Sequence, residues 1–385
     1  MNEHSASVNG ISIYSLTNPN LRSFCLSLYV RAGSIFEDSS NNGISHLFEH
    51  VVFRNIKNKY ENFYELLAMH GLCFQGSTYK KFVSFTIDGP QHEFDFAIEI
   101  LCGLFDEIKL TSHDFNNEKG RIKAEIREKD RRSSLDFYFD SIVWKNSEVE
   151  KIVLGYCKTV DRVSVKKINE FRQKVLSAGN CFVYATGNIS DENLDALNKK
   201  ISELDISQSN PGFTNTVTVN DEFFHREKKI WIKNNYWHYI QIGFDVDCSK
   251  YPGGVYDLLY ALLFNGDKAL VYNYLSEDNP IIYSYDSAFA QYDNVGNINF
   301  SFEVDRNKIE DVFKTVVELL NAAKDGRFNF EANLNYEMFN WELDLDKPSN
   351  LNWNMACYNH ILKTEPIDYS DEFYGRFRVT KKQVT

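Results

Sequence analysis

Two histidines and a glutamate, His46, Glu49 and His50, stand within five residues of one another. On a helix, residues four positions apart lie on one face, so both imidazoles can point at a single metal ion. Glu49 lies beside them, where its carboxylate can accept a proton from a metal-bound water. Imidazole and carboxylate donors are typical of zinc, and a catalytic zinc site requires a third protein ligand. The segment therefore predicts two ligands and a general base, and leaves one ligand to be found.

The same histidines could instead lie on a solvated helix face or be satisfied within a core. The chain has nine histidines in 385 residues, so a chance H-x-x-E-H pattern is uncommon. Apolar residues at Leu47, Val51 and Val52 predict one buried helix face, and Gly43 predicts a break just before the helix. These flanks favour the metal-binding interpretation.

A second candidate helix begins near Ser112 or Asp114, either of which is its expected N-cap. Glu118 and Glu125 lie two helical turns apart and share a face with Ile122. A carboxylate on a half-buried face needs a partner, and a metal cation would supply one. The alternative is a charged surface helix, because the glutamates are surrounded by basic residues: Lys119, Arg121, Lys123, Arg127 and Lys129.

The run Gly43-Ile44-Ser45-His46-Leu47-Phe48-Glu49-His50, followed by Glu118 and Glu125, resembles the pitrilysin/insulinase family of zinc peptidases. Residues 30–37 and 68–78 resemble the segments that flank the zinc helix in that family. The resemblance implies that His46, His50 and Glu125 bind one zinc ion, that Glu49 is the general base, and that Glu118 orients the site from behind the ligands.

The resemblance also implies that an edge strand contacts the substrate, and Gln75, Gly76 and Ser77 match that strand. The unpaired backbone groups of an edge strand can pair with an extended peptide. The family typically has asparagine where this chain has Gln75, so we expect an altered side-chain fit with peptide binding retained. The alternative is an ordinary sheet strand.

The second half departs from the family at the residues that stabilise the tetrahedral intermediate. The family has an arginine there, followed seven positions later by a tyrosine. The corresponding residues here are Ser276 and Tyr283. The arginine is therefore missing, and Tyr283 is either a substrate contact or only a strand aromatic.

Composition narrows the class of protein. The net charge of −12 argues against a nucleic-acid partner. The sequence lacks a signal-peptide pattern and any apolar stretch of about 18 residues, so no membrane span is expected. Seven scattered cysteines without a C-x-x-C pattern favour a reduced, cytoplasmic protein.

The order of apolar segments, together with the resemblance, predicts an α+β protein of two homologous halves. Each half would be an α/β sandwich, an antiparallel sheet with helices on one face, and the halves would close like a clam. Residues 1–207 form the expected zinc-binding catalytic domain, 208–217 a turn-rich linker, and 218–385 a degenerate and shortened second domain. Within the second half we expect a strand over 229–233 and one long helix over 254–275.

Three functions remain open at this stage. The first is a zinc endopeptidase subunit that acts as a heterodimer with a related chain supplying the arginine and tyrosine, as in family branches that remove leader sequences from ribosomally made antimicrobial peptides. The second is a non-catalytic scaffold subunit with a vestigial metal site. The third is a self-sufficient, peptide-degrading enzyme. An intact Glu49 argues against the scaffold, and Ser276 argues against self-sufficiency.

Overall fold

The computed structural model describes residues 3–129, 135–213, 217, 219, 223, 237–362 and 378–385. The chain forms two compact units, and each unit is built from segments that are separated in sequence. The first unit comprises Met1–Ser133, Glu148–Asn215 and Asp344–Ile361. The second comprises Ser134–Ser147, Thr216–Leu343 and Leu362–Thr385. The division into a catalytic domain over 1–207 and a second domain over 218–385 stays a prediction, and each compact unit contains segments from both of these ranges.

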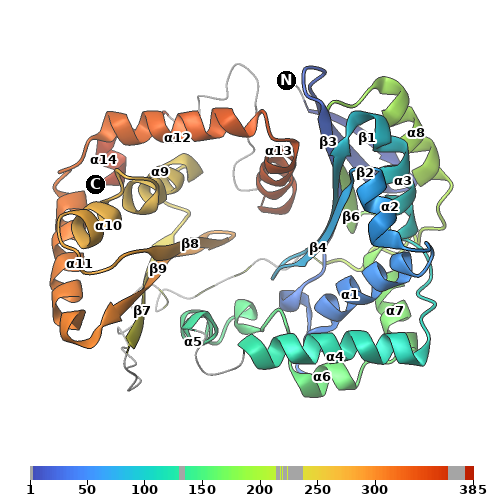
Figure 1. The fold of residues 1–385 in the computed structure, drawn as a ribbon, viewed down its shortest axis with the longest axis horizontal. Helices are drawn as coiled ribbons and strands as arrows, with labels where there is room; N and C mark the ends of the chain where they lie inside the picture. The colour runs from blue at the N-terminus through green and yellow to red at the C-terminus, as the bar shows by residue number, and fades with distance from the viewer. Residues whose placement is uncertain are drawn as a thin grey trace. The chain divides into compact units, whose positions relative to one another are not determined.

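A six-stranded sheet forms the centre of the first unit, with strand order β1-β2-β6-β3-β5-β4 (Figure 1). Its neighbouring strands are antiparallel, as predicted, except for β2 and β6, which run parallel and make the sheet mixed. The strands are β1 His4–Val8, β2 Ile11–Thr17, β3 Ser23–Val30, β4 Cys73–Thr78, β5 Val83–Pro90 and β6 Cys181–Gly187.

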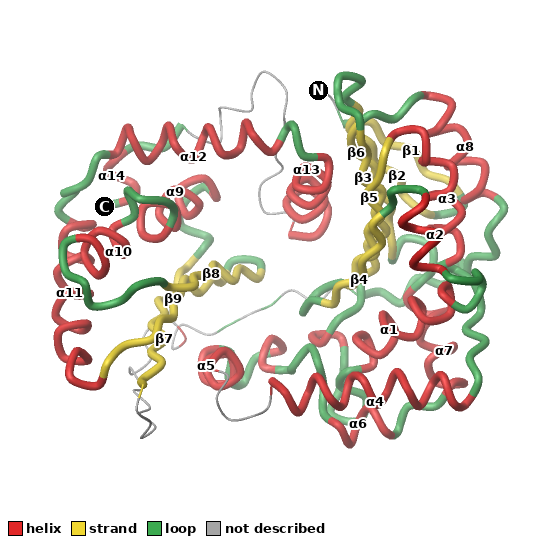
Figure 2. Tube along the Cα trace, viewed as in Figure 1, coloured by secondary structure: helices red, strands yellow, loops and turns green. Residues whose placement is uncertain are grey.

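Helices cover one face of this sheet, as Figure 2 shows for α1, α3 and α8. The apolar residues of alternate strand positions, among them Leu26, Leu28 and Phe85, are buried beneath them. The helices of this unit are α1 Ile44–Lys57, α2 Phe63–Met69, α3 Phe94–Gly103, α4 Ser112–Lys129, α6 Cys157–Asp161, α7 Val165–Val175 and α8 Asp191–Ser202. Among the described residues, no helix of either unit is both long and apolar enough to cross a membrane.

The opposite face of the sheet is covered by a segment from near the end of the chain, α13 Pro348–Met355, which continues into the π-helical turn η7 Ala356–Leu362. Asn352 of α13 is fully buried, donates hydrogen bonds to the carbonyl oxygens of Cys25 and Tyr184, and accepts one from the Tyr29 hydroxyl. The sequence did not predict that this segment belongs to the first unit.

The second unit contains a three-stranded antiparallel sheet of order β7-β9-β8. The predicted helix over 254–275 is interrupted: Asn265 is extended and Gly266 adopts a positive φ of 70°, so the helix cannot continue. The predicted strand over 229–233 lies outside the described residues. The elements are α5 Leu135–Val143, β7 Trp237–Asp247, α9 Gly253–Phe264, α10 Leu270–Tyr272, the π-helical turn η5 Asn273–Glu277, β8 Tyr285–Tyr292, β9 Val295–Asp305, α11 Ile309–Lys324, α12 Phe330–Asp344 and α14 Lys381–Val384.

Candidate metal centre

A buried carboxylate fixes the start of α1. Gly43 is the N-cap and has a positive φ of 95°. The Glu37 carboxylate accepts hydrogen bonds from the backbone N–H of Gly43 (2.7 Å), the backbone N–H of Ser45 (2.8 Å) and the side-chain amide of Asn42 (2.8 Å). These N–H groups have no partner within the helix, and a negative charge at a helix N-terminus is favourable. Glu37 therefore anchors α1 just before its first histidine.

The structure brings His46, His50 and Glu125 together. One ligand atom from each lies within 4.8 Å of the others. The Oε2 atom of Glu125 is 3.5 Å from Nε2 of His46 and 4.0 Å from Nε2 of His50. Two imidazole nitrogens and one carboxylate oxygen that converge in this way fit a tetrahedral zinc ion with its fourth position open, which is the arrangement of catalytic sites.

Helix α4 supplies both glutamates from one face, with Ile122 fully buried between them. Glu118 is buried, with 2% of its surface exposed. Its Oε2 lies 3.6 Å from Nδ1 of His50, whereas Nε2 of the same ring faces Glu125. A carboxylate in this place favours the tautomer that leaves Nε2 available to a metal. Helix α4 begins at Ser112, so the residue before it is Thr111 and not one of the predicted caps, Ser112 or Asp114; the Thr111 hydroxyl accepts a hydrogen bond from the Asp114 N–H.

Two lysines of α4 are directed toward α6. Lys119 donates a hydrogen bond to the carbonyl of Asp161, and Lys123 lies 2.7 Å from the Asp161 carboxylate. Both therefore lie toward α6 instead of α1. Arg121 and Arg54 approach Glu118, whose Oε1 lies 3.6 Å and 4.0 Å from their respective nitrogens. The alternative of a merely solvated helix does not describe the face that carries Glu118 and Glu125.

The electrostatic field at the histidines favours positive charge. Burial alone would lower the pKa of His50, but the carboxylates of Glu118, Glu49 and Glu125 outweigh it and raise that pKa. Burial raises the pKa of the Glu49 carboxyl, and His50 and Thr78 oppose that shift only in part. A cation placed among these groups would relieve the repulsion between the carboxylates.

Strand β4 lies at one edge of the sheet and touches the predicted general base. The hydroxyl of Thr78 donates a hydrogen bond of 2.9 Å to Oε2 of Glu49. Gly76 faces the same carboxylate. Of the other predicted substrate contacts of this strand, Gln75 is exposed and Ser77 is partly exposed, and the Gln75 side chain donates a hydrogen bond to Sγ of Cys73.

The remaining predicted contact, Tyr283, lies in the second unit and is 96% exposed. Sequence analysis did not identify Thr78 or Glu37 as site residues. The alternation of side chains along a strand places Thr78 on the same side as Gly76, and this is the signal that could have found it.

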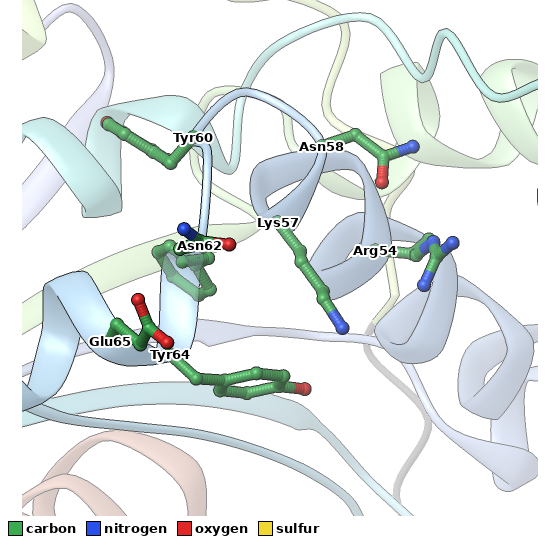
Figure 3. Close-up of a pocket in the computed structure, with 8 residues that line it drawn as sticks. Arg54, Lys57, Asn58, Tyr60, Asn62, Tyr64 and Glu65 are labelled. Atoms are coloured by element: carbon green, nitrogen blue, oxygen red, sulfur yellow. The ribbon is translucent and has the colours of Figure 1, made fainter.

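A pocket of about 490 Å³ lies where α1 ends and α2 begins (Figure 3). Arg54, Lys57 and Asn58 approach it from the end of α1, and Tyr64 and Glu65 approach it from α2. The Lys57 ammonium lies 4.5 Å from the centre of the Tyr64 ring. Arg54 also bonds to Asp114 at 2.6 Å, so this pocket shares a residue with the contacts around Glu118.

Comparison with known sequences finds matches along most of the chain. Residues 13–155 match the family model described as insulinase (peptidase family M16), and residues 162–332 match that of the peptidase M16 inactive domain. The zinc protease YmxG of Bacillus subtilis is 21% identical over 324 residues, which cover 82% of this chain and 77% of that protein. The mitochondrial-processing peptidase subunit beta of Saccharomyces cerevisiae is 23% identical over 190 residues, 48% of this chain and 41% of that protein.

Solved structures share the fold over nearly the whole chain. A protease from Helicobacter pylori superposes with a TM-score of 0.84 at 18% identity, covering 99% of this chain and 94% of that one. A peptidase M16 inactive domain from Pseudomonas fluorescens superposes with a TM-score of 0.80 at 13% identity, covering 100% and 93%. These likenesses show a two-domain α/β fold with a mixed sheet and helices.

Proposed function

The chain belongs to the peptidase M16 (insulinase) family, and we propose that it is a zinc-dependent endopeptidase that cleaves extended peptides. The observation that carries the proposal is the convergence of His46, His50 and Glu125, with the carboxylate of Glu49 beside them. A scaffold subunit with a vestigial site would not need Glu49.

The residues divide the chemistry between them. Zinc, when bound by His46, His50 and Glu125, lowers the pKa of a coordinated water and polarises the scissile carbonyl. Glu49 takes a proton from the attacking water and passes it to the leaving amine. Its raised pKa brings the carboxyl closer to the range in which it can both accept and return that proton. Glu118 holds the His50 ring from its far side.

The substrate would be an extended peptide that pairs with the edge strand β4. An edge strand presents unpaired N–H and C=O groups, and backbone pairing tolerates variation in side chains. Gln75, Gly76 and Ser77 would then contact the peptide. We propose the leader sequence of a ribosomally made antimicrobial peptide as the substrate, since a leader is an unfolded segment that can add to an edge.

A related partner chain would complete the active site. Ser276 stands where an arginine is expected, and loss of one oxyanion donor typically lowers the rate by about 10²–10³. We therefore propose a heterodimer in which a homologous subunit supplies the arginine and tyrosine. The resemblance to a subunit of mitochondrial-processing peptidase supports this arrangement.

The test compares Glu49→Gln with Glu128→Gln. The two variants make the same chemical change, and Glu128 is exposed on α4. Each protein is assayed for zinc content and for hydrolysis of a leader-containing peptide, alone and mixed with a second M16-family chain of the same organism. We expect both variants to bind about one zinc per chain. The rate of hydrolysis should fall by about 10²–10⁴ in Glu49→Gln and stay unchanged in Glu128→Gln. Unchanged hydrolysis in that variant contradicts the proposed base, and full turnover by the unmixed wild type contradicts the need for a partner.

A further inference from the structure

One face of β4 contacts α1 at three successive inward-pointing positions. Side chains alternate along a strand, so Phe74, Gly76 and Thr78 share one face. The Phe74 ring stacks on Phe53 of α1 with 4.7 Å between ring centres and 5° between the planes. One step further along the strand, Gly76 and Thr78 both meet Glu49. The register between α1 and β4 is thus set by an aromatic pair, and the next two inward positions contact the base.

Strand β4 donates a hydrogen bond to one carboxylate oxygen of Glu49 and leaves room for the other. Oε2 accepts the hydrogen bond from Thr78 at 2.9 Å. A Cβ atom built on Gly76 would lie only 2.8 Å from Oε1 and 2.9 Å from Cγ of Glu49. Gly76 is not among the glycines with positive φ, so its backbone does not require glycine. Glycine at this position therefore leaves the space that the Glu49 carboxylate occupies, and a larger residue would displace that carboxylate.

We propose that Thr78 and Gly76 are positioning residues that hold the Glu49 carboxylate in one orientation, so that the strand expected to receive the peptide also aims the base. This inference rests on the proposed function. A free glutamate side chain has three rotatable bonds, whereas the branched Thr78 side chain is stiff at χ1 and presents its hydroxyl in a fixed direction. When Thr78 holds Oε2 of Glu49, the orientation of the carboxylate is fixed, and Oε1 is the oxygen left to act as the base.

The chain offers a matched control for the loss of one hydroxyl from the sheet. Thr86 on β5 shares a hydrogen bond of 3.0 Å with the Ser27 hydroxyl. Thr86 pairs with Gln75, which is the outward neighbour of Gly76, so Thr86 lies on the face of the sheet opposite Glu49. Thr78→Val and Thr86→Val each remove one hydroxyl and keep the branched shape, but only Thr78→Val affects the base.

The experiment measures kcat, KM and zinc content for Thr78→Val, Thr78→Ser, Gly76→Ala and Thr86→Val, each in the wild-type assay mixture. We expect Thr78→Val to lower kcat by about 10- to 100-fold, which corresponds to one hydrogen bond to a charged group, with KM and zinc content unchanged. Serine keeps the hydroxyl and should restore kcat to within about 3-fold. Gly76→Ala should lower kcat and keep zinc, whereas Thr86→Val should behave as wild type.

A crystal structure of zinc-free Thr78→Val gives a readout that does not depend on activity. We expect the Glu49 carboxylate to leave the position that it occupies against Gly76 or to take several rotamers. A single, unmoved Glu49 rotamer, a kcat equal to wild type, or a serine variant as poor as valine overturns the inference. A wild type that binds zinc and hydrolyses no peptide overturns the proposed function instead, and the crystal structure still decides whether Thr78 positions Glu49.

Discussion

Replacing Asn352 by leucine should weaken the packing of α13 on the six-stranded sheet of the first unit. This side chain is fully buried and makes hydrogen bonds of 3.3 Å to the Cys25 carbonyl, 2.9 Å to the Tyr184 carbonyl and 2.9 Å from the Tyr29 hydroxyl. Leucine has the same number of side-chain heavy atoms, branched at Cγ as in asparagine, and cannot take part in any of these bonds. The substitution therefore removes the polar pairing, and its larger methyl groups add strain at this buried position.

The expected loss follows from the number of bonds and the groups left behind. Each neutral hydrogen bond contributes about 1 kcal/mol net, and a buried polar group left unsatisfied costs about 1–3 kcal/mol. Tyr29 is 2% exposed, so its hydroxyl cannot turn to water instead. We expect Asn352→Leu to lower the free energy of unfolding by about 3–5 kcal/mol, against a typical total of about 5–15 kcal/mol for a domain.

A double-mutant cycle with Tyr29→Phe isolates one of these bonds. Tyr29→Phe alone should lower the free energy of unfolding by about 1–2 kcal/mol, because Oδ1 of Asn352 loses its donor. The double variant should lose less than the sum of the two, by about 1 kcal/mol or more, because both partners of the bond are then apolar. Asn350→Leu is the control, since Asn350 is exposed on the same helix and bonds only to Asp344 among the contacts described.

The assay combines urea unfolding, followed by circular dichroism, with the rate at which Cys357 reacts with a thiol reagent. Cys357 lies in η7, is 9% exposed, and burial raises its pKa to about 12, so it reacts only when the segment opens. Faster labelling at this position in Asn352→Leu, without faster labelling in Asn350→Leu, is expected. A loss below about 0.5 kcal/mol with unchanged labelling would show that Asn352 does not anchor α13.

Two further predictions concern other anchors of the first unit. Glu37→Gln should lower the urea midpoint by the equivalent of about 2–3 kcal/mol, because one amide oxygen cannot accept all the bonds at the start of α1 and its NH₂ group opposes the N–H donors. The pKa of Glu3 is lowered overall, since burial would raise it but hydrogen bonds from His360 and Tyr184 outweigh that effect. The stabilisation by Glu3 is therefore present above its ordinary pKa of 4.5 and is lost as the pH falls through the lowered value. The urea midpoint of the wild type should fall more between about pH 5 and pH 3 than that of Glu3→Gln, and parallel curves would contradict the linkage.

Helical periodicity made the centre of the site readable from sequence. Spacings of four and seven place His46 with His50 and Glu118 with Glu125, and these relations hold in any helix. That the two helices face each other is not contained in either periodicity and came from the family resemblance. The contact of Thr78 with Glu49 depends on which face of β4 meets α1, so alternation alone could propose it but not select it.

Polar groups form part of the packing between α13 and β3. Helix α13 buries Pro348, Leu351 and Met355 together with Asn352, and the rest of it is largely polar: Ser349, Asn350 and Asn354. Its binding surface on β3 also contains polar groups: Cys25, Ser27 and Tyr29 alternate with Leu26 and Leu28, a pattern that is typical of a strand with one exposed face. The structure buries all three because hydrogen bonds, and not apolar area alone, connect the two elements. An alternating strand therefore does not by itself identify an exposed face.

Helix α4 has an acidic face and a basic face, and they contact different helices. Glu118 and Glu125 point toward α1, while Lys119 and Lys123, four residues apart, point toward α6 and meet Asp161. The spacing of the two glutamates favours the metal-binding interpretation, and the spacing of the two lysines favours a charged surface helix. Asp161 supplies acceptors for the two lysines, whereas Arg54 and Arg121 approach Glu118 on the glutamate face. The residue that separates the two interpretations thus lies outside α4, in a short helix that the periodicity of α4 cannot reveal.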